Sequence, residues 1–284
     1  MLRARRSLLL KGLMGCSALA LPPVGWAANQ SVAIVSSDTS VAYMEASQAA
    51  MDGLVHAGVS RYDIRLMSLS EWHEAHRNAA LPQPQVYLAL GTLASETLAT
   101  DLAGLASAQV LCALIPRNSF ERIVRARDWR FSGRFSAIYL DQPLKRQLTL
   151  IRLAFAKAQR LGVLWGPESI TRAVELRAQA QAAGLTLVEA QMNSQVGIFP
   201  AIKRVLDDCD FLLALPDPLV YNSNSIQNIL LSAMRKQVPL VAFSPAYVRA
   251  GAILALYQTP SQVGVQAAGL LGEVLRHKKL LSAP

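Results

Sequence analysis

Short apolar runs alternate with longer amphipathic segments along almost the whole chain after Ser31. The first run covers residues 32–35, and a segment with helical periodicity follows over residues 41–56 and stops at Gly58. This alternation is typical of βαβ units, in which helices join parallel strands. The pattern therefore predicts an α/β fold built on parallel sheets.

The remaining elements repeat this plan in two halves. The pattern predicts strands over residues 32–35, 63–67, 86–90 and 109–115 in the first half, and over residues 136–140, 161–164, 185–189, 211–215 and 240–243 in the second. It predicts helices over residues 41–56, 93–105, 143–158, 170–183, 198–206, 223–236 and 261–276. Because the halves are similar in plan, we expect two Rossmann-like lobes that face each other.

The crossing between the lobes is expected at residues 118–135, which are rich in arginine and aromatic side chains and contain a break at Ser132-Gly133. An extended apolar segment at residues 254–257 and the last helix are expected to return to the first lobe. The predicted organisation is a leader over residues 1–27, a first lobe over residues 28–135 plus 255–284, and a second lobe over residues 136–254.

The N-terminus has the composition of a cleavable signal peptide. Basic residues come first, an apolar stretch over residues 12–24 follows, and Gly25-Trp26-Ala27 supplies a small-x-small cleavage site. The basic residues are Arg3, Arg5, Arg6 and Lys11. A transmembrane anchor needs ~20 apolar residues, and this stretch is shorter and is broken by two prolines. Cleavage after Ala27 places the protein in the periplasm.

Two other uses of the leader stay open. Arg5-Arg6, followed by Ser7-Leu8-Leu9, partly matches a twin-arginine export signal, which carries folded proteins across the membrane. Leu13-Met14-Gly15-Cys16 resembles a bacterial lipobox, whose Cys16 would be lipidated and retained. Because Lys11 would then lie inside the apolar core of the signal, cleavage at Ala27 is favoured over a lipid anchor on Cys16.

Removal of the leader lowers the net positive charge of the protein. Residues 1–27 contain four basic residues and no acidic ones, so the formal charge falls from +9 to +5 and 257 residues remain. Nucleic-acid binding requires clustered basic residues, and only residues 117–134 are locally dense in arginine, which we interpret as a solvated helix face. No helix-turn-helix precedes Ser31. We therefore expect no nucleic-acid partner.

Residues that could carry out catalysis are sparse. The chain has no Gly-x-Ser-x-Gly elbow, no phosphate loop and no Gly-x-Gly-x-x-Gly after its first strand. His73 and His76, with Glu71 and Glu74 nearby, could bind zinc, but their polar surroundings favour a surface helix. We expect no enzymatic activity, no metal and no cofactor.

Two cysteines, Cys112 and Cys209, remain after the leader is removed. Cys112 lies in an apolar run and is expected to be a buried small hydrophobe. Their spacing does not indicate a metal site, and a disulfide between them stays open.

Polar residues at the predicted strand ends are the candidates for ligand binding. In open parallel sheets, ligands lie beyond the carboxyl ends of the strands. The residues selected by this rule are Ser36, Ser37, Thr92 and Arg117 in the first lobe and Asp217 and Ser244 in the second, with Glu168 and Asn222-Ser223-Asn224 on the same rim. Opposed Arg117 and Asp217 would suit the carboxylate and amino group of a zwitterion. Ser37, Thr92 and Ser223 could equally be helix caps.

The C-terminal third carries a family resemblance. The segments VPLVAFS at 238–244, YVRAGA at 247–252 and VGVQAA at 263–268, together with ALGTLA at 89–94, resemble the substrate-binding proteins of ABC transporters in the tryptophan/tyrosine-type family. The resemblance implies a type I periplasmic binding protein architecture, in which the lobes close by a hinge around a ligand. It also implies that Thr92, Asp217 and Ser244 are cleft positions, whereas Arg117 is selected by its position alone.

The expected function follows from the leader and the resemblance together. The chain departs from the family pattern at Ile115-Pro116-Arg117-Asn118 and at Asp217-Pro218, so the resemblance does not name the ligand. We expect the periplasmic solute-binding component of an ABC-type importer, which binds a small polar or amphipathic molecule and docks on a membrane permease. The alternative is a periplasmic ligand sensor or accessory protein that regulates a membrane partner with the same fold.

Overall fold

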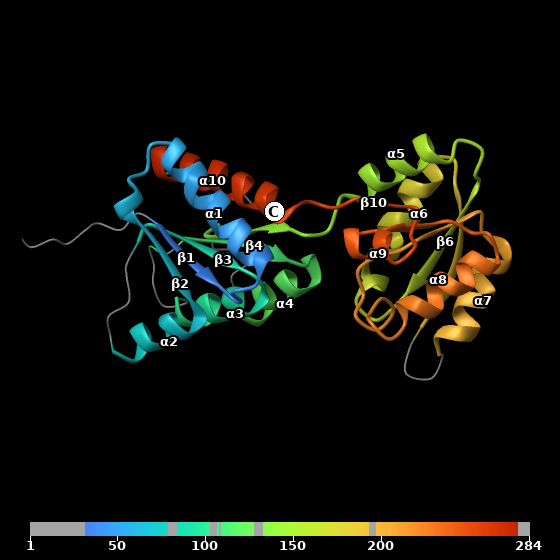
Figure 1. The fold of residues 1–284 in the computed structure, drawn as a ribbon, viewed down its shortest axis with the longest axis horizontal. Helices are drawn as coiled ribbons and strands as arrows, with labels where there is room; N and C mark the ends of the chain where they lie inside the picture. The colour runs from blue at the N-terminus through green and yellow to red at the C-terminus, as the bar shows by residue number, and fades with distance from the viewer. Residues whose placement is uncertain are drawn as a thin grey trace, which may run out of the picture.

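The computed structural model describes residues 32–78, 84–102, 107, 109–127, 133–192 and 197–277. The predicted signal peptide, including Cys16, lies outside the described residues. Within the described part of the chain, no helix is long and apolar enough to cross a membrane. The described elements form two α/β lobes, each built around one parallel sheet (Figure 1).

Each lobe has a five-stranded sheet with helices on both faces. The first sheet has the order β2-β1-β3-β4-β5 and the second the order β10-β9-β8-β6-β7. The strands are β1 (Val32–Ser36), β2 (Ile64–Ser68), β3 (Val86–Leu90), β4 (Gln109–Ile115), β5 (Phe135–Tyr139), β6 (Arg160–Trp165), β7 (Thr186–Gln191), β8 (Phe211–Leu213), β9 (Leu240–Ala242) and β10 (Leu254–Ala255). All pairings within both sheets are parallel, as the alternation of runs predicts.

The helices follow the strands in the order expected for βαβ units. They are α1 (Val41–His56), α2 (Leu69–Arg77), α3 (Thr92–Asp101), α4 (Arg117–Arg127), α5 (Leu144–Ala154), α6 (Ala173–Ala182), α7 (Ile198–Asp208), α8 (Ile226–Arg235), α9 (Pro245–Arg249) and α10 (Pro260–His277), with short 3₁₀ turns η1 (Arg61–Asp63) and η3 (Ser169–Arg172).

The central strands of the first sheet are almost entirely apolar because helices cover both of its faces. Strands β1 and β3 are buried along their whole length. One apolar cluster contains Trp72, Leu98 and Phe120 from α2, α3 and α4, and the other contains Leu54 and Leu271 from α1 and α10. A continuous apolar run, without alternation, is the pattern of a parallel strand that lies between two helical layers.

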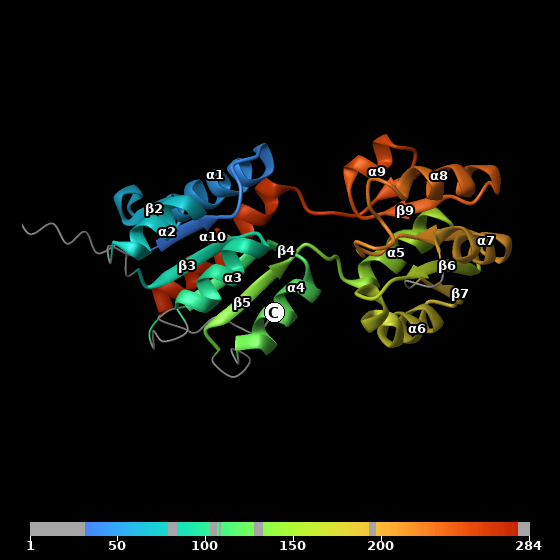
Figure 2. The ribbon, with the colours of Figure 1, turned by 90° about the horizontal axis from the view of Figure 1, so that it is seen from below.

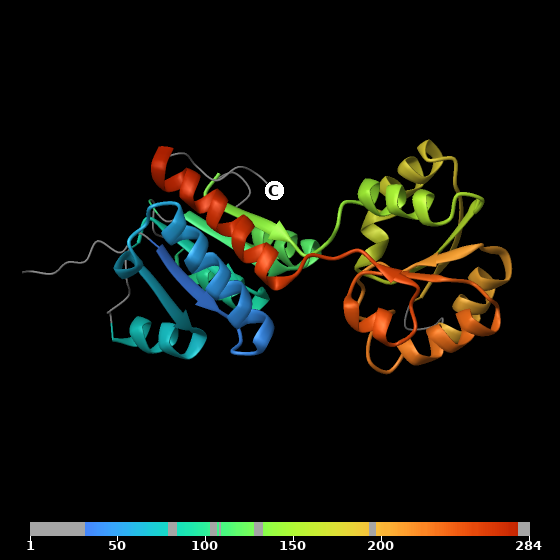
Figure 3. The same cartoon turned by 45° about the horizontal axis from the view of Figure 1, so that its top comes forward.

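The last helix returns to the first lobe and lies against the first helix. Figure 3 shows α10 running alongside α1. The helices approach closely because glycines replace side chains at the contact: a Cβ added at Gly264 would lie 2.3 Å from the Ala46 carbonyl oxygen, and one added at Gly53 would lie 2.6 Å from the Ala268 Cβ. The two ends of the described chain therefore build one layer of the first lobe together.

The crossing between the lobes lies later in the chain than the sequence predicted. Strand β5, which we expected to open the second lobe, pairs with β4 in the first sheet. Residues 117–127 form α4 on the first lobe and not a connecting segment. The chain passes between lobes after β5 and again after β10 (Figure 2). The prediction was wrong because the pattern of a strand indicates its burial, but not the sheet that it joins.

The two cysteines are buried, free and in different lobes, so the disulfide left open by the sequence is absent. Burial raises the pKa of the Cys112 thiol to about 12 and that of the Cys209 thiol to about 11. Because the thiolate is the nucleophile, we expect neither residue of the native protein to react with iodoacetamide at mildly alkaline pH, while both react after unfolding in guanidinium. Peptide mass spectrometry distinguishes the two sites. Equal labelling of Cys209 in the native and unfolded protein would contradict this prediction.

Candidate functional site

A cleft of about 420 Å³ lies between the two lobes. Its first wall comes from the start of α4 and from the crossing after β5, and contains Pro116, Asn118, Ser119, Arg122 and Asp141. Its second wall comes from the segments after β6, β8 and β9, and contains Glu168, Pro216, Asp217, Pro218, Tyr221, Asn222 and Phe243. These segments follow the carboxyl ends of parallel strands, where ligands bind in open α/β sheets.

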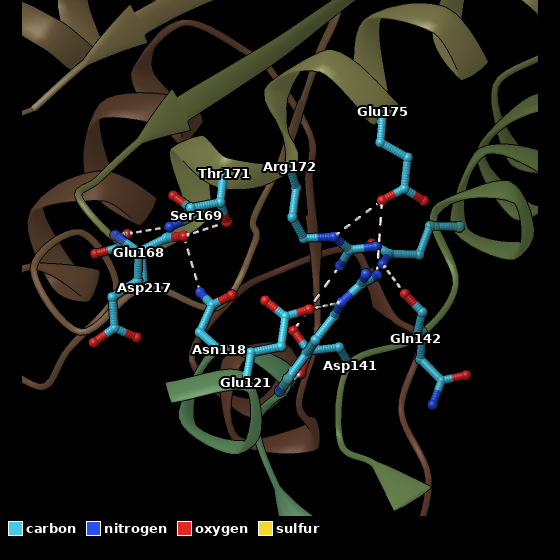
Figure 4. Close-up of polar contacts among 12 residues, drawn as sticks. Asn118, Glu121, Asp141, Gln142, Glu168, Ser169, Thr171, Arg172, Glu175 and Asp217 are labelled. Carbon is cyan, nitrogen blue, oxygen red and sulfur yellow. Dashed lines mark hydrogen bonds and ion pairs between the residues drawn. The ribbon is translucent and has the colours of Figure 1, made fainter. Parts of the chain in front are cut away.

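The N-terminus of α4 is held by groups on both sides of the cleft. The Asp141 carboxylate accepts the Arg117 backbone N–H at 2.7 Å, a position where negative charge is favoured by the helix dipole. The Asn118 side-chain amide donates to the Glu168 carbonyl oxygen at 2.9 Å (Figure 4). Because Asn118 belongs to the first lobe and Glu168 to the second, this hydrogen bond spans the cleft.

Asp217 shapes the second wall through bonds to the backbone. Its Oδ2 accepts the N–H groups of Glu168 at 3.0 Å and Ser169 at 2.8 Å, and its Oδ1 accepts that of Leu219 at 3.0 Å. The residue is only 2% exposed. The sequence suggested that Asp217 binds the amino group of a ligand, but the structure uses its carboxylate to join the segment after β6 to the segment after β8.

Arg117 lies at the junction of the lobes and not in the cleft lining. Its Nε donates to Glu121 Oε1 at 2.8 Å, and its Nη1 lies 4.0 Å from Glu175 Oε2 in the second lobe. Its guanidinium also lies over the Tyr139 ring at 5.9 Å. The hydrogen bond to Glu121 raises the pKa of Arg117 above its ordinary value. The side chain is therefore engaged by carboxylates of this chain.

Arg172 is a functional candidate that the sequence did not single out. It is only 8% exposed, its Nη1 lies 3.9 Å from Asp141 Oδ1, and its Nε lies 3.6 Å from Glu175 Oε2. Neither nitrogen makes a hydrogen bond with the described residues. Figure 4 shows Arg172 between these two carboxylates. Buried charges require partners, so Arg172 and Arg117 form a charged network that spans the lobe junction.

The other predicted residues lie within single lobes, outside the cleft lining, and two of them form local hydrogen bonds. The Ser36 hydroxyl donates to the Asp38 carbonyl oxygen at 2.7 Å, and the Ser37 hydroxyl accepts the Ala94 N–H at 2.8 Å. Ser37 thus caps α3 from a neighbouring loop. Thr92 begins α3 and Ser244 precedes α9, and both are half-buried.

Of the six residues selected first from the sequence, only Asp217 is among those that line the cleft as described, and it is joined there by Glu168 and Asn222, which the sequence placed on the same rim. Ligands in parallel sheets bind beyond the carboxyl ends of the strands, and Asp141 follows β5 closely. The same rule could therefore have found Asp141 if β5 had been assigned to the first lobe. The α4 residues Asn118, Ser119 and Arg122 were not predicted from the sequence, because their segment has the pattern of a connection between lobes. Tyr221 carries no local signal, since its role depends on packing against distant residues.

The possible zinc site does not form among the described residues, where no group of three or more histidine, cysteine or acidic side chains could hold a metal ion. Glu71 instead caps α2: its carboxylate accepts the Ser68 N–H at 2.7 Å, and the Ser68 hydroxyl accepts the Glu71 N–H. This capping box lowers the pKa of Glu71. His76 lies 3.8 Å from Asp101 and is half-exposed.

Several solved structures that are similar in fold to this chain are described as binding proteins or as parts of ABC transporters. The ligand-free, open structure of CD0873, a substrate binding protein with adhesive properties from Clostridium difficile, has a TM-score of 0.66 at 14% identity and covers 90% of this chain and 88% of its own. An ABC domain in complex with L-Trp from Streptococcus pneumonia has a TM-score of 0.58 at 18% identity, with the same coverage. A branched chain amino acid ABC transporter periplasmic ligand-binding protein from Burkholderia xenovorans has a TM-score of 0.55 at 10% identity and covers 88% and 79%.

The sequence itself matches a family model. No curated protein matches the chain, but the model described as "ABC transporter substrate binding protein" matches residues 138–284, more than half of the chain. The matched segment includes the whole second lobe and the returning helix α10. The chain therefore belongs to the family of ABC transporter substrate binding proteins and has the type I periplasmic binding protein fold.

Proposed function

We propose that this chain is the periplasmic solute-binding component of an ABC-type importer. The observation that carries the proposal is a cleft between two lobes, lined by polar groups from the strand ends of both, in a chain of this family. The protein catalyses no reaction. It binds one small solute and delivers it to a membrane permease that docks on the lobes.

The proposed mechanism is hinge closure of the lobes around the ligand. Two connections, after β5 and after β10, join the lobes, and hinges are a few residues that absorb large changes of backbone angle. The contacts from Asn118 to Glu168 and from Arg117 to Glu175 cross the junction, so closure must rearrange them. A ligand that contacts both walls shifts the population toward the closed state.

The ligand is proposed to be small and polar or amphipathic. The cleft combines charged and amide side chains with the rings of Tyr221 and Phe243 and with three prolines, a mixture typical of small-molecule sites. The resemblance in the C-terminal third favours the tryptophan/tyrosine-type branch of the family, and we propose that the chain belongs to this branch. Membership of the branch does not by itself identify the ligand.

The direct test is recovery of a ligand from the mature protein. Purified protein is incubated with a metabolite extract, washed and denatured, and released molecules are identified by mass spectrometry. We expect one small molecule, which raises the melting temperature of the empty protein and reduces its radius of gyration in small-angle scattering. Ser119→Trp fills the cleft and is expected to weaken binding about tenfold or more, while the exposed Ser261→Trp on α10 leaves it unchanged. An empty cleft and no thermal shift with the extract would overturn the proposal.

Uptake measurements separate import from sensing. Cells that lack this protein are expected to lose high-affinity uptake of the identified ligand, and wild-type protein restores it. Unchanged uptake, with a changed transcriptional response to the ligand, would instead assign the protein to a signalling system.

A further inference from the structure

Most of the charged side chains on the cleft walls have a hydrogen-bond or ion-pair partner within the chain, but one does not. Asp217 is bonded to three backbone N–H groups, and Asp141 accepts the Arg117 N–H and lies near Arg172. The guanidinium of Arg122, on the α4 side, lies 3.4 Å from Glu96 of α3. The carboxylate of Glu168 has no hydrogen bond or ion pair with any described residue, although its backbone is fixed at both ends. Among the charged side chains that line the cleft, Glu168 is therefore the one whose charged group has no partner among the described residues.

Backbone donors suited to an anion are scarce on the same walls. Three lining residues, Pro116, Pro216 and Pro218, have no N–H group. The N–H groups at the start of η3, which would otherwise attract an anion, are occupied by Asp217. At the start of α4, Asp141 already accepts the first N–H, so an anion beside that helix end would also lie close to a carboxylate. The walls thus resist a carboxylate or phosphate group.

Aromatic rings lie on the same wall as Glu168. Phe243 lines the cleft and packs edge-on against Tyr221, with centroids 6.0 Å apart, and against Tyr247, at 4.9 Å. Tyr221 also lines the cleft, is only 5% exposed, and its buried hydroxyl has no hydrogen-bond partner within the described part of the chain. Ring faces attract organic cations, so these rings favour a positively charged ligand beside Glu168.

We propose that the ligand is an organic amine whose ammonium group binds the Glu168 carboxylate beside Tyr221 and Phe243, and that it carries no carboxylate. This inference rests on the proposed function, because it assigns a ligand class to the same cleft. It replaces the zwitterion suggested by the sequence, since Arg117 and Asp217 are engaged within the chain. Glu168 is then the residue that selects for positive charge.

The test compares ligands that share a body and differ in their charged group. Calorimetric titrations use two matched sets: 2-phenylethylamine, phenylalanine and phenylacetate; and tryptamine, tryptophan and indole-3-acetate. We expect an amine to bind at least about tenfold more tightly than the amino acid and the acid of its set, which is the effect of one charge-assisted hydrogen bond. Glu168→Gln is expected to weaken amine binding by a similar factor without lowering the melting temperature. Glu273→Gln, an exposed site on α10, makes the same charge change and leaves binding unaltered.

The outcomes separate this inference from the proposed function. Tighter binding of an amino acid or an acid than of the corresponding amine would overturn the inference and leave the solute-binding function standing, as would full amine affinity in Glu168→Gln. If neither set binds, the molecule captured from the metabolite extract decides: an amine without a carboxylate supports the inference, and any anion or zwitterion overturns it. Capture of nothing overturns the solute-binding function and the inference together.

Discussion

Gly166→Ala is expected to unfold the second wall of the cleft. Gly166 follows β6, and a Cβ added there would lie 2.3 Å from Cγ and Oδ1 of Asp217. Because Asp217 is buried and bonded to three backbone N–H groups, it cannot move aside without leaving those donors unpaired. Overpacking and lost buried hydrogen bonds together should lower the free energy of unfolding by about 3 kcal/mol or more. Urea denaturation measures the loss.

A matched alanine and a polar variant identify the cause of this loss. Gly197→Ala places a Cβ where nothing lies within 4 Å, so it should cost no more than about 1 kcal/mol, the loss of a glycine at the N-cap of α7. Asp217→Asn keeps the shape but removes the charge, and we expect a loss of about 2 kcal/mol from weaker bonds to the backbone. In hydrogen exchange, the segment 166–170 should lose protection in both Gly166→Ala and Asp217→Asn. Wild-type stability of Gly166→Ala would mean that the close approach to Asp217 is wrong.

Gly264→Val is expected to separate α10 from α1. A Cβ at residue 264 would lie 2.3 Å from the Ala46 carbonyl oxygen and 2.8 Å from the Ala49 Cβ. The first obstacle is backbone, which cannot rotate away as a side chain can, so the helices must move apart and expose part of the cluster around Leu54 and Leu271. We expect a loss of about 3 kcal/mol in the free energy of unfolding, measured by thermal or urea denaturation.

The same helix supplies the control for this variant. Gly269 has nothing within 4 Å of an added Cβ, so Gly269→Ala should stabilise the protein by about 0.5 to 1 kcal/mol through helix propensity. Opposite signs for the two variants would show that packing against α1, and not glycine content, determines the stability of α10. A destabilising Gly269→Ala would refute this account. Residue 264 is not among the residues that line the cleft, so the ligand affinity of the folded fraction should not change.

The bounds of helices and strands could be predicted from the sequence far better than the pairing of strands within the sheets. The helix expected over residues 41–56 is α1 to the residue, and the strand expected over residues 86–90 is β3. Both succeed because burial imposes a local periodicity on the chain. The assignment of β5 to the wrong lobe failed because strand pairing is decided by contacts far apart in sequence, and it concealed Asp141 as a cleft residue.

Site prediction was limited by hydrogen bonds that a pattern cannot reveal. The strand-end rule placed Asp217 on the cleft correctly, but the N–H groups that it accepts belong to residues 48 and 49 positions away in the sequence and to Leu219. Arg172 falls inside a segment that was predicted to be an ordinary helix, and only the folded structure brings it near Asp141 and Glu175. A sequence does not distinguish a carboxylate that has hydrogen-bond partners in the fold from one that has none.

The return of α10 to α1 has a consequence for the order of folding. The second lobe is one continuous segment between the two connections, whereas the first lobe needs both ends of the described chain. During synthesis or transfer from the N-terminus, the first lobe exposes the apolar surface of α1 until the last helix arrives, while the second lobe can already fold as a unit. The first part of the chain to emerge is thus the last to be completed, and a chain truncated before residue 260 would leave that surface open to aggregation or to a chaperone.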